Sequence, residues 1–319
     1  MTVTEQTLFS SCRKRIKMKE KIQKLNKGLG DKLYSGSFLA PSLIGVMVFF
    51  IIPFFVVIYY AFIDSPIGRN FVLFQNFQRV LGSTAFQDGA RHTAMFSAVS
   101  VPLAVILSLL LATLLEQKIP LKSQLRTFFL SPMMVPVASI VLIWEVLFHR
   151  NGAVNEILAN IGAATGWFTF DPIDWFSSAY AQLPIVVLFL WRTLGYNMIL
   201  FMAALNNIPR DLLEVASLEG GSNFFIFRTI KLRFLSPTIL FVTILSLINS
   251  FKVFREVYLL RGSRPYGSLY TLQHYMNNMF HMLDYQSLAA AAIIMAIVMI
   301  LIIGLLFVAE NWYGKDVEG

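Results

Sequence analysis

The chain has 319 residues, of which 56% are hydrophobic and 14% are charged, and its formal net charge is +8 at pH 7. An average soluble domain is about 25% charged and less apolar, so this composition excludes a soluble globular protein and a disordered one. Cys12 is the one cysteine, which excludes an intrachain disulfide, and no Cys and His stand at the spacing of a metal site.

The first 35 residues are basic and contain no apolar segment of the kind found in a signal peptide. Nine of them are Lys or Arg, so we expect 1–35 to form a cytoplasmic tail. Ile22, Leu25 and Leu29 stand at helical spacing between lysines. This spacing fits a short helix on the anionic membrane surface or, as the simpler alternative, a solvated tail that only orients the protein.

Six apolar segments are long enough to cross a bilayer, which needs about 20 residues. They are 38–63, 93–115, 127–148, 182–205, 238–260 and 288–309. Five residues within them mark expected kinks or close helix contacts, namely Pro53, Pro102, Pro132, Pro136 and Gly195. The sequence therefore predicts an all-α, polytopic membrane protein with a transmembrane domain over 36–312 and a C-terminal tail over 313–319.

The distribution of basic residues orients these crossings. Seventeen Lys and Arg residues lie in the two tails and the loops on the same side, whereas six lie in the opposite loops. Cytoplasmic loops are enriched in Lys and Arg, so both termini are predicted to be cytoplasmic, in the inner or plasma membrane. Membrane topology thus explains the net charge, and no nucleic-acid partner is needed.

The predicted outer loop 149–181 is rich in apolar and aromatic residues. Its first part has the spacing of a short amphipathic helix. The aromatic residues that follow are typical of the membrane interface, with a docking partner as the alternative. They are Trp167, Phe168, Trp175 and Phe176.

The predicted cytoplasmic loop 206–237 is too polar to cross the membrane and too regular for a linker. Pro209 and Asp211 suit the first turn of a helix, and Gly220 with Gly221 suits its end. The apolar side chains of this helix of about ten residues could enter a groove on another protein, although a plain connecting helix is the alternative. These side chains are Leu212, Leu213, Ala216 and Leu218.

The spacing within this loop carries a resemblance to a known family. Glu214-x-Ala216, then Gly220 after three residues and Ile230-x-Leu232 after nine more, resembles the EAA loop of permease subunits of binding-protein-dependent ABC importers. The segments 39–62, 190–205 and 236–260 are similar to carbohydrate-type permeases, and the likeness covers about 39–308. Two positions depart from the consensus, because Val215 replaces an alanine and Arg233 a proline, with Pro237 the residue that could bend the chain instead.

This resemblance implies a type I ABC importer permease fold and a set of partners. The partners are a second permease, most often a different chain, two ABC ATPases that hold ATP and Mg²⁺, and an extracytoplasmic substrate-binding protein. The EAA helix would dock on an ATPase, with Glu214 as a polar contact and Gly220 as the turn. The sequence has no G-x-x-x-x-G-K-[ST] motif, so we expect no nucleotide or other cofactor in this chain and no catalytic residue.

Polar residues within crossings usually face a cavity or a partner, so eight residues are candidates for a substrate pathway. They are Trp191, Arg192, Tyr196, Asn197, Asn249, Lys252, Arg255 and Glu256. Planar hydrogen-bonding groups and aromatic rings suit sugars, and the cations Arg192 and Lys252 at one depth also permit an anionic glycan. The alternative is structural, with Lys252 or Arg192 paired to Glu256 or Arg192 paired to the partner subunit.

Three further interpretations complete the prediction. His274 and His281 are expected to be surface histidines rather than metal ligands, with contact to the binding protein as their functional alternative. An ion-gradient-driven secondary transporter is the alternative function, and it would need coupling carboxylates near the midplane. A membrane hydrolase would need a nucleophile with a base or a metal cluster, and neither spacing occurs.

Overall fold

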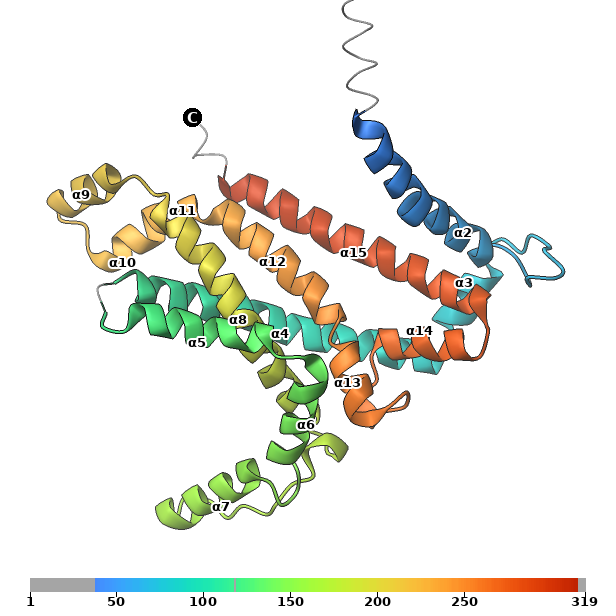
Figure 1. Cartoon of the computed structure of the whole chain (residues 1–319), viewed down its shortest axis with the longest axis horizontal. Coiled ribbons are helices and arrows are strands. Elements are labelled where there is room, and N and C mark those ends of the chain that lie inside the picture. The colour runs from blue at the N-terminus through green and yellow to red at the C-terminus, as the bar shows by residue number, and fades with distance from the viewer. Residues whose placement is uncertain (1–37, 118, 315–319) are drawn as a thin grey trace, which may run out of the picture. The chain divides into compact units, whose positions relative to one another are not determined.

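The computed structural model describes residues 38–117 and 119–314, and these residues are helical apart from turns and loops, with one isolated bridge between Ile63 and Phe71. The basic tail, Cys12 and residues 315–319 of the predicted C-terminal tail lie outside the described residues, whereas 313 and 314 end the last helix. Five helices in this part are long and apolar enough to cross a membrane, and a bent helix pair is a sixth candidate (Figure 1). The all-α prediction is therefore confirmed.

The chain divides into two units, residues 1–60 and 61–319, which we describe separately. The first unit contains most of the apolar helix Phe38–Ala61. This helix changes to π-helical geometry at η1 (Met47–Ile51) and continues as α2 (Ile52–Ala61). Pro53 is the second residue after the π segment, and a proline has no amide hydrogen to donate to the preceding turn.

The second unit is built around three spans that lie side by side. α4 (Thr84–Glu116) contacts both α8 (Gln182–Asn206) and α12 (Ser236–Phe251), and α15 (Tyr285–Gly314) contacts α12 (Figure 1). Two clusters of buried apolar side chains hold these helices together, one around Leu188 and one around Phe201. The two clusters occupy successive levels of α8, so this helix is the common support of the unit.

The third predicted crossing is not one straight helix. α5 (Lys122–Met134) and α6 (Val137–Leu147) meet at an angle of 100°. The break falls at Pro136, and the residue before it, Val135, has the extended backbone that a following proline enforces. The kink predicted at Pro136 within 127–148 is thus confirmed, because this proline ends the first helix.

Gly195 allows two of these helices to approach each other closely. A Cβ atom at Gly195 would lie 1.9 Å from the carbonyl oxygen of Phe129 in α5. No side chain fits in that space, so the prediction of a close helix contact at this glycine is confirmed.

The span after α12 is interrupted near one end. α12 ends at Phe251, Lys252 and Val253 form a turn, and α13 (Phe254–Arg261) begins directly after it. Irregular backbone at membrane depth is tolerated where protein or a polar cavity surrounds it.

The connecting segments contain short helices. They are α3 (Gln75–Leu81), α7 (Ala153–Thr165), η2 (Trp175–Ser177), η4 (Gly267–Leu269) and α14 (Leu272–His281). Helix α7 confirms the amphipathic pattern in 149–181. The aromatic residues divide: Trp167 is exposed, whereas Trp175 and Phe176 are buried in the core, where the Trp175 indole donates to Asn155 Oδ1 at 2.8 Å. The expectation of an interfacial or docking role was therefore wrong for Trp175 and Phe176.

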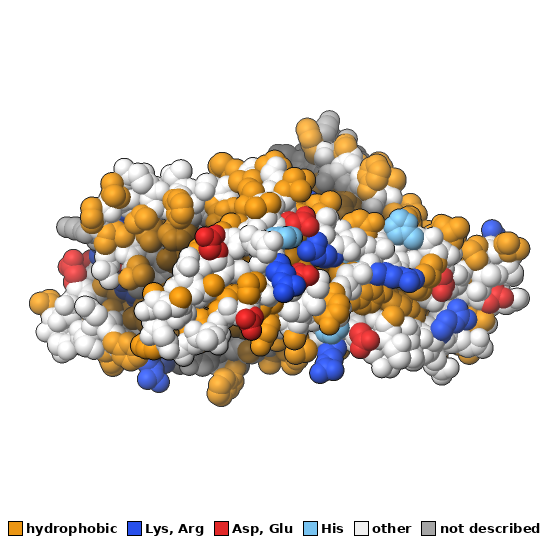
Figure 2. Space-filling view, turned by 90° about the horizontal axis from the view of Figure 1, so that it is seen from below, with side chains coloured by type: hydrophobic (Ala, Val, Ile, Leu, Met, Phe, Trp, Pro, Cys, Tyr) orange, Lys and Arg blue, Asp and Glu red, His pale blue; other side chains and the backbone are white. Residues whose placement is uncertain are grey.

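Figure 2 shows the molecule turned by 90° about the horizontal axis of Figure 1, so that it is seen from below. Hydrophobic side chains cover much of this face, and acidic and basic side chains are interspersed among them. Large exposed apolar side chains also occur along α4 and α15, for example Ile106 and Leu305. Such exposure is what a lipid-facing helix requires.

Candidate functional site

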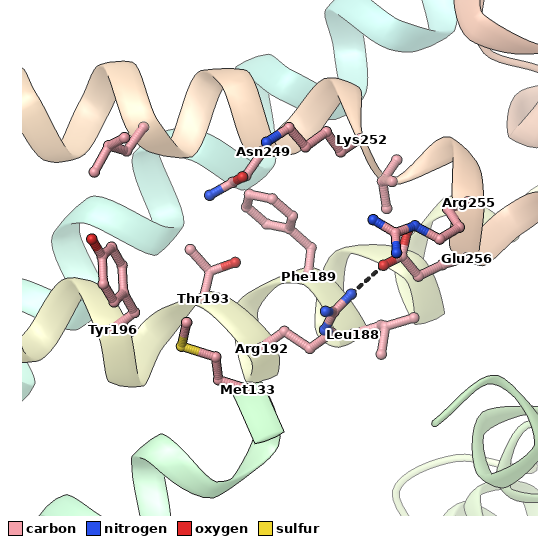
Figure 3. A pocket seen from close by; sticks show the side chains of 12 residues that line it. Met133, Leu188, Phe189, Arg192, Thr193, Tyr196, Asn249, Lys252, Arg255 and Glu256 are labelled. Atoms are coloured by element: carbon pink, nitrogen blue, oxygen red, sulfur yellow. Dashed lines mark hydrogen bonds and ion pairs between the residues drawn. The ribbon is translucent and has the colours of Figure 1, made fainter. Parts of the chain in front are cut away.

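A cavity of about 420 Å³ lies between α8 and the interrupted α12–α13 span (Figure 3). This volume is within the range of small-molecule sites, roughly 300–1,000 Å³. Six of the eight predicted pathway residues line it, namely Arg192, Tyr196, Asn249, Lys252, Arg255 and Glu256. We call this cavity the polar pocket.

Arg192 of α8 and Glu256 of α13 form an ion pair across the polar pocket (Figure 3). Glu256 is only 5% exposed, and a buried carboxylate needs a partner of this kind. Arg192 Nε and Glu256 Oε2 are buried without a hydrogen-bond partner among the described residues. The pair therefore neutralises itself but keeps one donor and one acceptor for a further polar group.

Lys252 and Arg255 enlarge the positive charge of the polar pocket. Both side chains are exposed, and neither forms an ion pair of its own among the described residues. Asn249 precedes Lys252 by one helical turn, and Tyr196 lies one turn after Arg192 on the opposite wall. The pocket thus combines cations, an amide and a phenol.

Two predicted pathway residues do not line the polar pocket. Trp191 packs against Trp144 of α6, with ring centroids 5.2 Å apart. Asn197 is 1% exposed, and its amide donates to Ser246 Oγ at 2.9 Å. Both therefore join helices, since a one-residue step along α8 turns a side chain away by about 100°.

The polar pocket also has a lining that sequence reasoning missed. Met133 of α5, Thr193 and Phe189 contribute to it, together with Leu188, Leu245 and Val253. The predicted proline break near Met133 was a signal that this end of α5 lines a site. The apolar residues gave no such signal, because they fit a buried helix face equally well.

The loop 206–237, which we call the coupling loop, lies at the other end of α8 and α12. α9 (Arg210–Leu218) follows Pro209, with Asp211 in its first turn, as predicted. α10 (Asn223–Ile226), the π segment η3 (Phe227–Lys231) and α11 (Leu232–Phe234) then lead to α12. No residue of α9 is buried.

Glycine ends α9 in the way the sequence predicted. Gly220 has φ +83°, and its N–H donates to Ser217 O at 3.1 Å. The N–H of Gly221 donates to Ala216 O at 2.9 Å. This pair of bonds is the Schellman motif, which favours glycine at the left-handed position.

The apolar side chains of α9 do not share one face. Leu213 packs against the core cluster around Phe201, so it anchors the helix instead of being presented outward. Leu212, Val215 and Leu218 are 44%, 52% and 88% exposed. Glu214 is exposed beside them. The exposed face therefore includes Val215, the position that departs from the family consensus.

Arg233, which stands where the family consensus has a proline, lies within a helix. α11 continues through Arg233 to Phe234, and α12 begins at Ser236 with Pro237 in its first turn. The bend at Pro237 therefore stays a prediction, since Leu235, between the two helices, has right-handed helical dihedral angles.

An ion pair that the sequence did not predict joins the coupling loop to α4. Lys231 Nζ lies 2.8 and 2.7 Å from the two carboxylate oxygens of Glu116. The two residues are 115 positions apart, so no local pattern could reveal the contact. It fixes the π segment to the end of the longest span of this unit.

His274 is fully buried, which corrects the expectation of a surface histidine. Its Nδ1 accepts a hydrogen bond from the Thr271 N–H at 3.1 Å, which closes the first turn of α14. Burial lowers the pKa of His274 from 6.5 to about 4. No cluster of three or more His, Cys, Asp or Glu side chains that could hold a metal occurs among the described residues.

Comparison with known proteins adds the family context. Residues 100–317 match the family described as "Binding-protein-dependent transport system inner membrane component". The chain is 29% identical to the trehalose/maltose transport system permease protein of Thermococcus litoralis, over 87% of this chain and 93% of that one. It is also 29% identical to the lactose transport system permease protein of Rhizobium radiobacter, over 84% and 91%.

The fold has a solved counterpart. One chain of a bacterial ABC transporter involved in the import of the acidic polysaccharide alginate superposes with a TM-score of 0.77 and 20% identity. The match covers 93% of this chain and all of that one. At this identity the likeness concerns the fold alone.

Proposed function

Because this chain belongs to the family of binding-protein-dependent transport system inner membrane components, we propose that it is the permease of an ATP-driven importer for an oligosaccharide or related glycan. The chain is a multi-pass membrane subunit with the type I ABC importer permease fold, and it is not an enzyme. The similar permeases of the lactose and trehalose/maltose systems support a glycan as the substrate.

The exposed face of α9 is the observation that carries the coupling part of the proposal. Leu212, Val215 and Leu218 are exposed on a helix that lies outside the spans, beside the charged Glu214. Amphipathic helices of this length commonly bind in a groove of another protein. A cytoplasmic ABC ATPase is the partner that the family supplies, with ATP and Mg²⁺ bound in that separate chain.

The remaining partners follow from the same membership. A second permease, most simply a different chain, two ATPases and an extracytoplasmic substrate-binding protein complete the proposed importer. The excess of Lys and Arg in the tails and the coupling loop supports a cytoplasmic position for both termini and α9. The polar pocket then lies toward the outer side, near the binding protein.

Helix α8 connects the coupling loop to the polar pocket, and this connection suggests how the transport cycle works. Arg192 and Asn206 lie on the same helix α8, roughly 21 Å apart at about 1.5 Å per residue. A rigid helix can transmit a displacement of α9 to the polar pocket when the ATPases close. In this alternating-access scheme, ATP binding opens the pocket toward the binding protein, and hydrolysis restores the inward-facing state.

The first experiment is purification of the tagged chain in mild detergent with identification of the proteins that copurify. We expect a second permease and an ABC ATPase. Stable recovery of this chain alone, with uptake driven by an ion gradient and no need for ATP, would support the secondary transporter instead.

The second experiment tests the coupling helix in the complete importer. Glu214→Arg should reduce stimulation of ATP hydrolysis by the loaded binding protein at least tenfold. Glu219→Arg is the matched control, because it introduces the same charge change just beyond the end of α9, and stimulation should stay within about twofold. Full stimulation in Glu214→Arg would contradict the proposed docking.

A further inference from the structure

The charges of the polar pocket do not balance. Arg192, Lys252 and Arg255 are positive, and Glu256 is the one acidic side chain among the lining residues. The ion pair between Arg192 and Glu256 consumes one charge of each sign. Two positive charges, those of Lys252 and Arg255, are therefore in excess.

Such an excess is costly in a membrane-spanning segment. Lys252 and Arg255 lie within the apolar helix pair Ser236–Arg261. Charged side chains within membrane helices are costly and rare, and those that persist there commonly line ion or substrate pathways. Both side chains line the cavity, where Arg255 lies close to Glu256 (Figure 3), and neither forms an ion pair of its own among the described residues.

A neutral glycan would not need these cations. The hydroxyl groups of a neutral sugar can be bound by the amide of Asn249, the hydroxyl of Thr193 and the phenol of Tyr196, which already line the pocket. Ammonium and guanidinium groups are the groups that proteins use for carboxylates and phosphates. The pocket has both sets, so its occupant should combine hydroxyl groups with an anionic group.

The arrangement of the two cations also suits a single ligand. Lys252 forms the turn between α12 and α13, and Arg255 follows one helical turn later, at the first turn of α13. Arg192 and Tyr196 lie on the opposite wall, on α8 (Figure 3).

We infer that the substrate of this permease is an anionic glycan, whose acidic group is received by Lys252 and Arg255 while Asn249, Thr193 and Tyr196 bind its hydroxyl groups. This inference rests on the proposed function. The acidic group is a carboxylate or a phosphate, since both chemistries suit the same cations.

The test uses the complete importer in proteoliposomes that contain ATP. The probe is a mixture of oligosaccharides from pectin, alginate and starch together with sugar phosphates, and mass spectrometry identifies the compounds that accumulate. We expect accumulation of acidic compounds, with uronates or phosphates distinguishing the two chemistries. ATP-dependent accumulation of neutral oligosaccharides alone, or of no compound in the mixture, would overturn the inference.

Variants test the assigned residues. Lys252→Gln and Arg255→Gln should each lower the initial uptake rate of the acidic probe at least tenfold, whereas Lys252→Arg should stay within about threefold. Arg150→Gln, which removes an exposed cation outside the pocket, should leave uptake unchanged. Size-exclusion chromatography must show that each variant still assembles with its partners. If a cation pairs with the partner permease instead, its removal would weaken the complex and lower uptake for that structural reason.

The outcomes separate the two proposals. Uptake of acidic probes in both glutamine variants within twofold of the unaltered protein would refute the role of the cations, even if import is driven by ATP. Uptake that does not depend on ATP would refute the proposed function itself.

Discussion

The polar pocket and the coupling loop lie at opposite ends of α8 and α12 but are stabilised in different ways. The pocket depends on contacts between distant segments, such as the ion pair between Arg192 and Glu256, 64 positions apart. The coupling helix α9 depends mostly on local bonds, namely the Schellman motif at Gly220 and the anchor Leu213. Its exposed face is free within this unit.

This difference explains which region can be recognised from sequence. Local capping signals specify a helix without knowledge of the fold, and a docking surface must remain uncovered by its own chain. A substrate pocket, in contrast, requires several helices to be placed correctly before any of its residues meet. We therefore expect substitutions to affect the two regions differently.

The largest expected effect is loss of both regions together. Gly195→Val places a side chain on the Phe129 carbonyl, where even a Cβ atom would lie 1.9 Å from the oxygen. Because α8 supports both sites, the variant should lose nearly all monodisperse protein in size-exclusion chromatography. Gly304→Val is the control, since no heavy atom lies within 4 Å of a Cβ there, and normal yield of Gly195→Val would contradict the prediction.

The next effect should be confined to the polar pocket. Arg192→Met leaves the buried Glu256 carboxylate unpaired, which should destabilise the protein by about 3–5 kcal/mol. Thermal unfolding in detergent measures this loss. Adding Glu256→Met should recover part of it, whereas Lys252→Met alone should change stability by less than about 0.5 kcal/mol. Equal losses of stability in Arg192→Met and Lys252→Met would contradict this prediction, because Lys252 would then stabilise the fold as much as Arg192 does.

A fall in pH should destabilise the region of α13 and α14, beside the polar pocket, before it destabilises the coupling loop. His274 packs against Phe254, the first residue of α13, with ring centroids 4.6 Å apart. Because the folded-state pKa of about 4 lies below the ordinary 6.5, the unfolded chain binds the proton more readily. The contribution of His274 is complete above pH 6.5 and is lost as the pH falls toward 4, a decrease of about 3 kcal/mol.

Thermal unfolding between pH 7.5 and pH 4.5 checks this expectation. His274→Gln should flatten the pH dependence of the melting temperature, whereas His281→Gln should leave it unchanged. A pH dependence that survives His274→Gln would assign the acid sensitivity to another group.

The smallest expected effect concerns the coupling loop. Lys231→Gln removes the ion pair with Glu116, whose side chains are partly exposed, so the loss should be about 1 kcal/mol. Amide hydrogen exchange over 223–234 should then rise about fivefold, with no change around Glu256. Glu214→Arg, on the exposed face of α9, should not raise this exchange. Unchanged exchange in Lys231→Gln would mean that packing alone holds the loop.

The features that could be predicted from the sequence are those that depend on local residues, and the others depend on contacts between distant segments. The helical class, most spans and the end of α9 at Gly220 could be read from apolar length and capping residues. The kink at Pro136 could also be predicted, but its angle of 100° could not, and the prediction of a surface histidine was wrong because apolar contacts bury His274. Six pathway residues lie together because helical spacing and depth placed them on facing walls, whereas Trp191 and Asn197 turn away.

The sequence by itself determined that this protein is a multi-span helical membrane protein with a helix that ends at Gly220 in a motif similar to the EAA loop, because hydrophobic length and capping residues act locally. Only the tertiary structure decided which charges meet. Sequence left Glu256 with Lys252 or Arg192 as a partner, and the packing of α8 against α13 pairs it with Arg192. Packing likewise joins Lys231 to Glu116, because interactions across helices depend on distances that no chain spacing encodes.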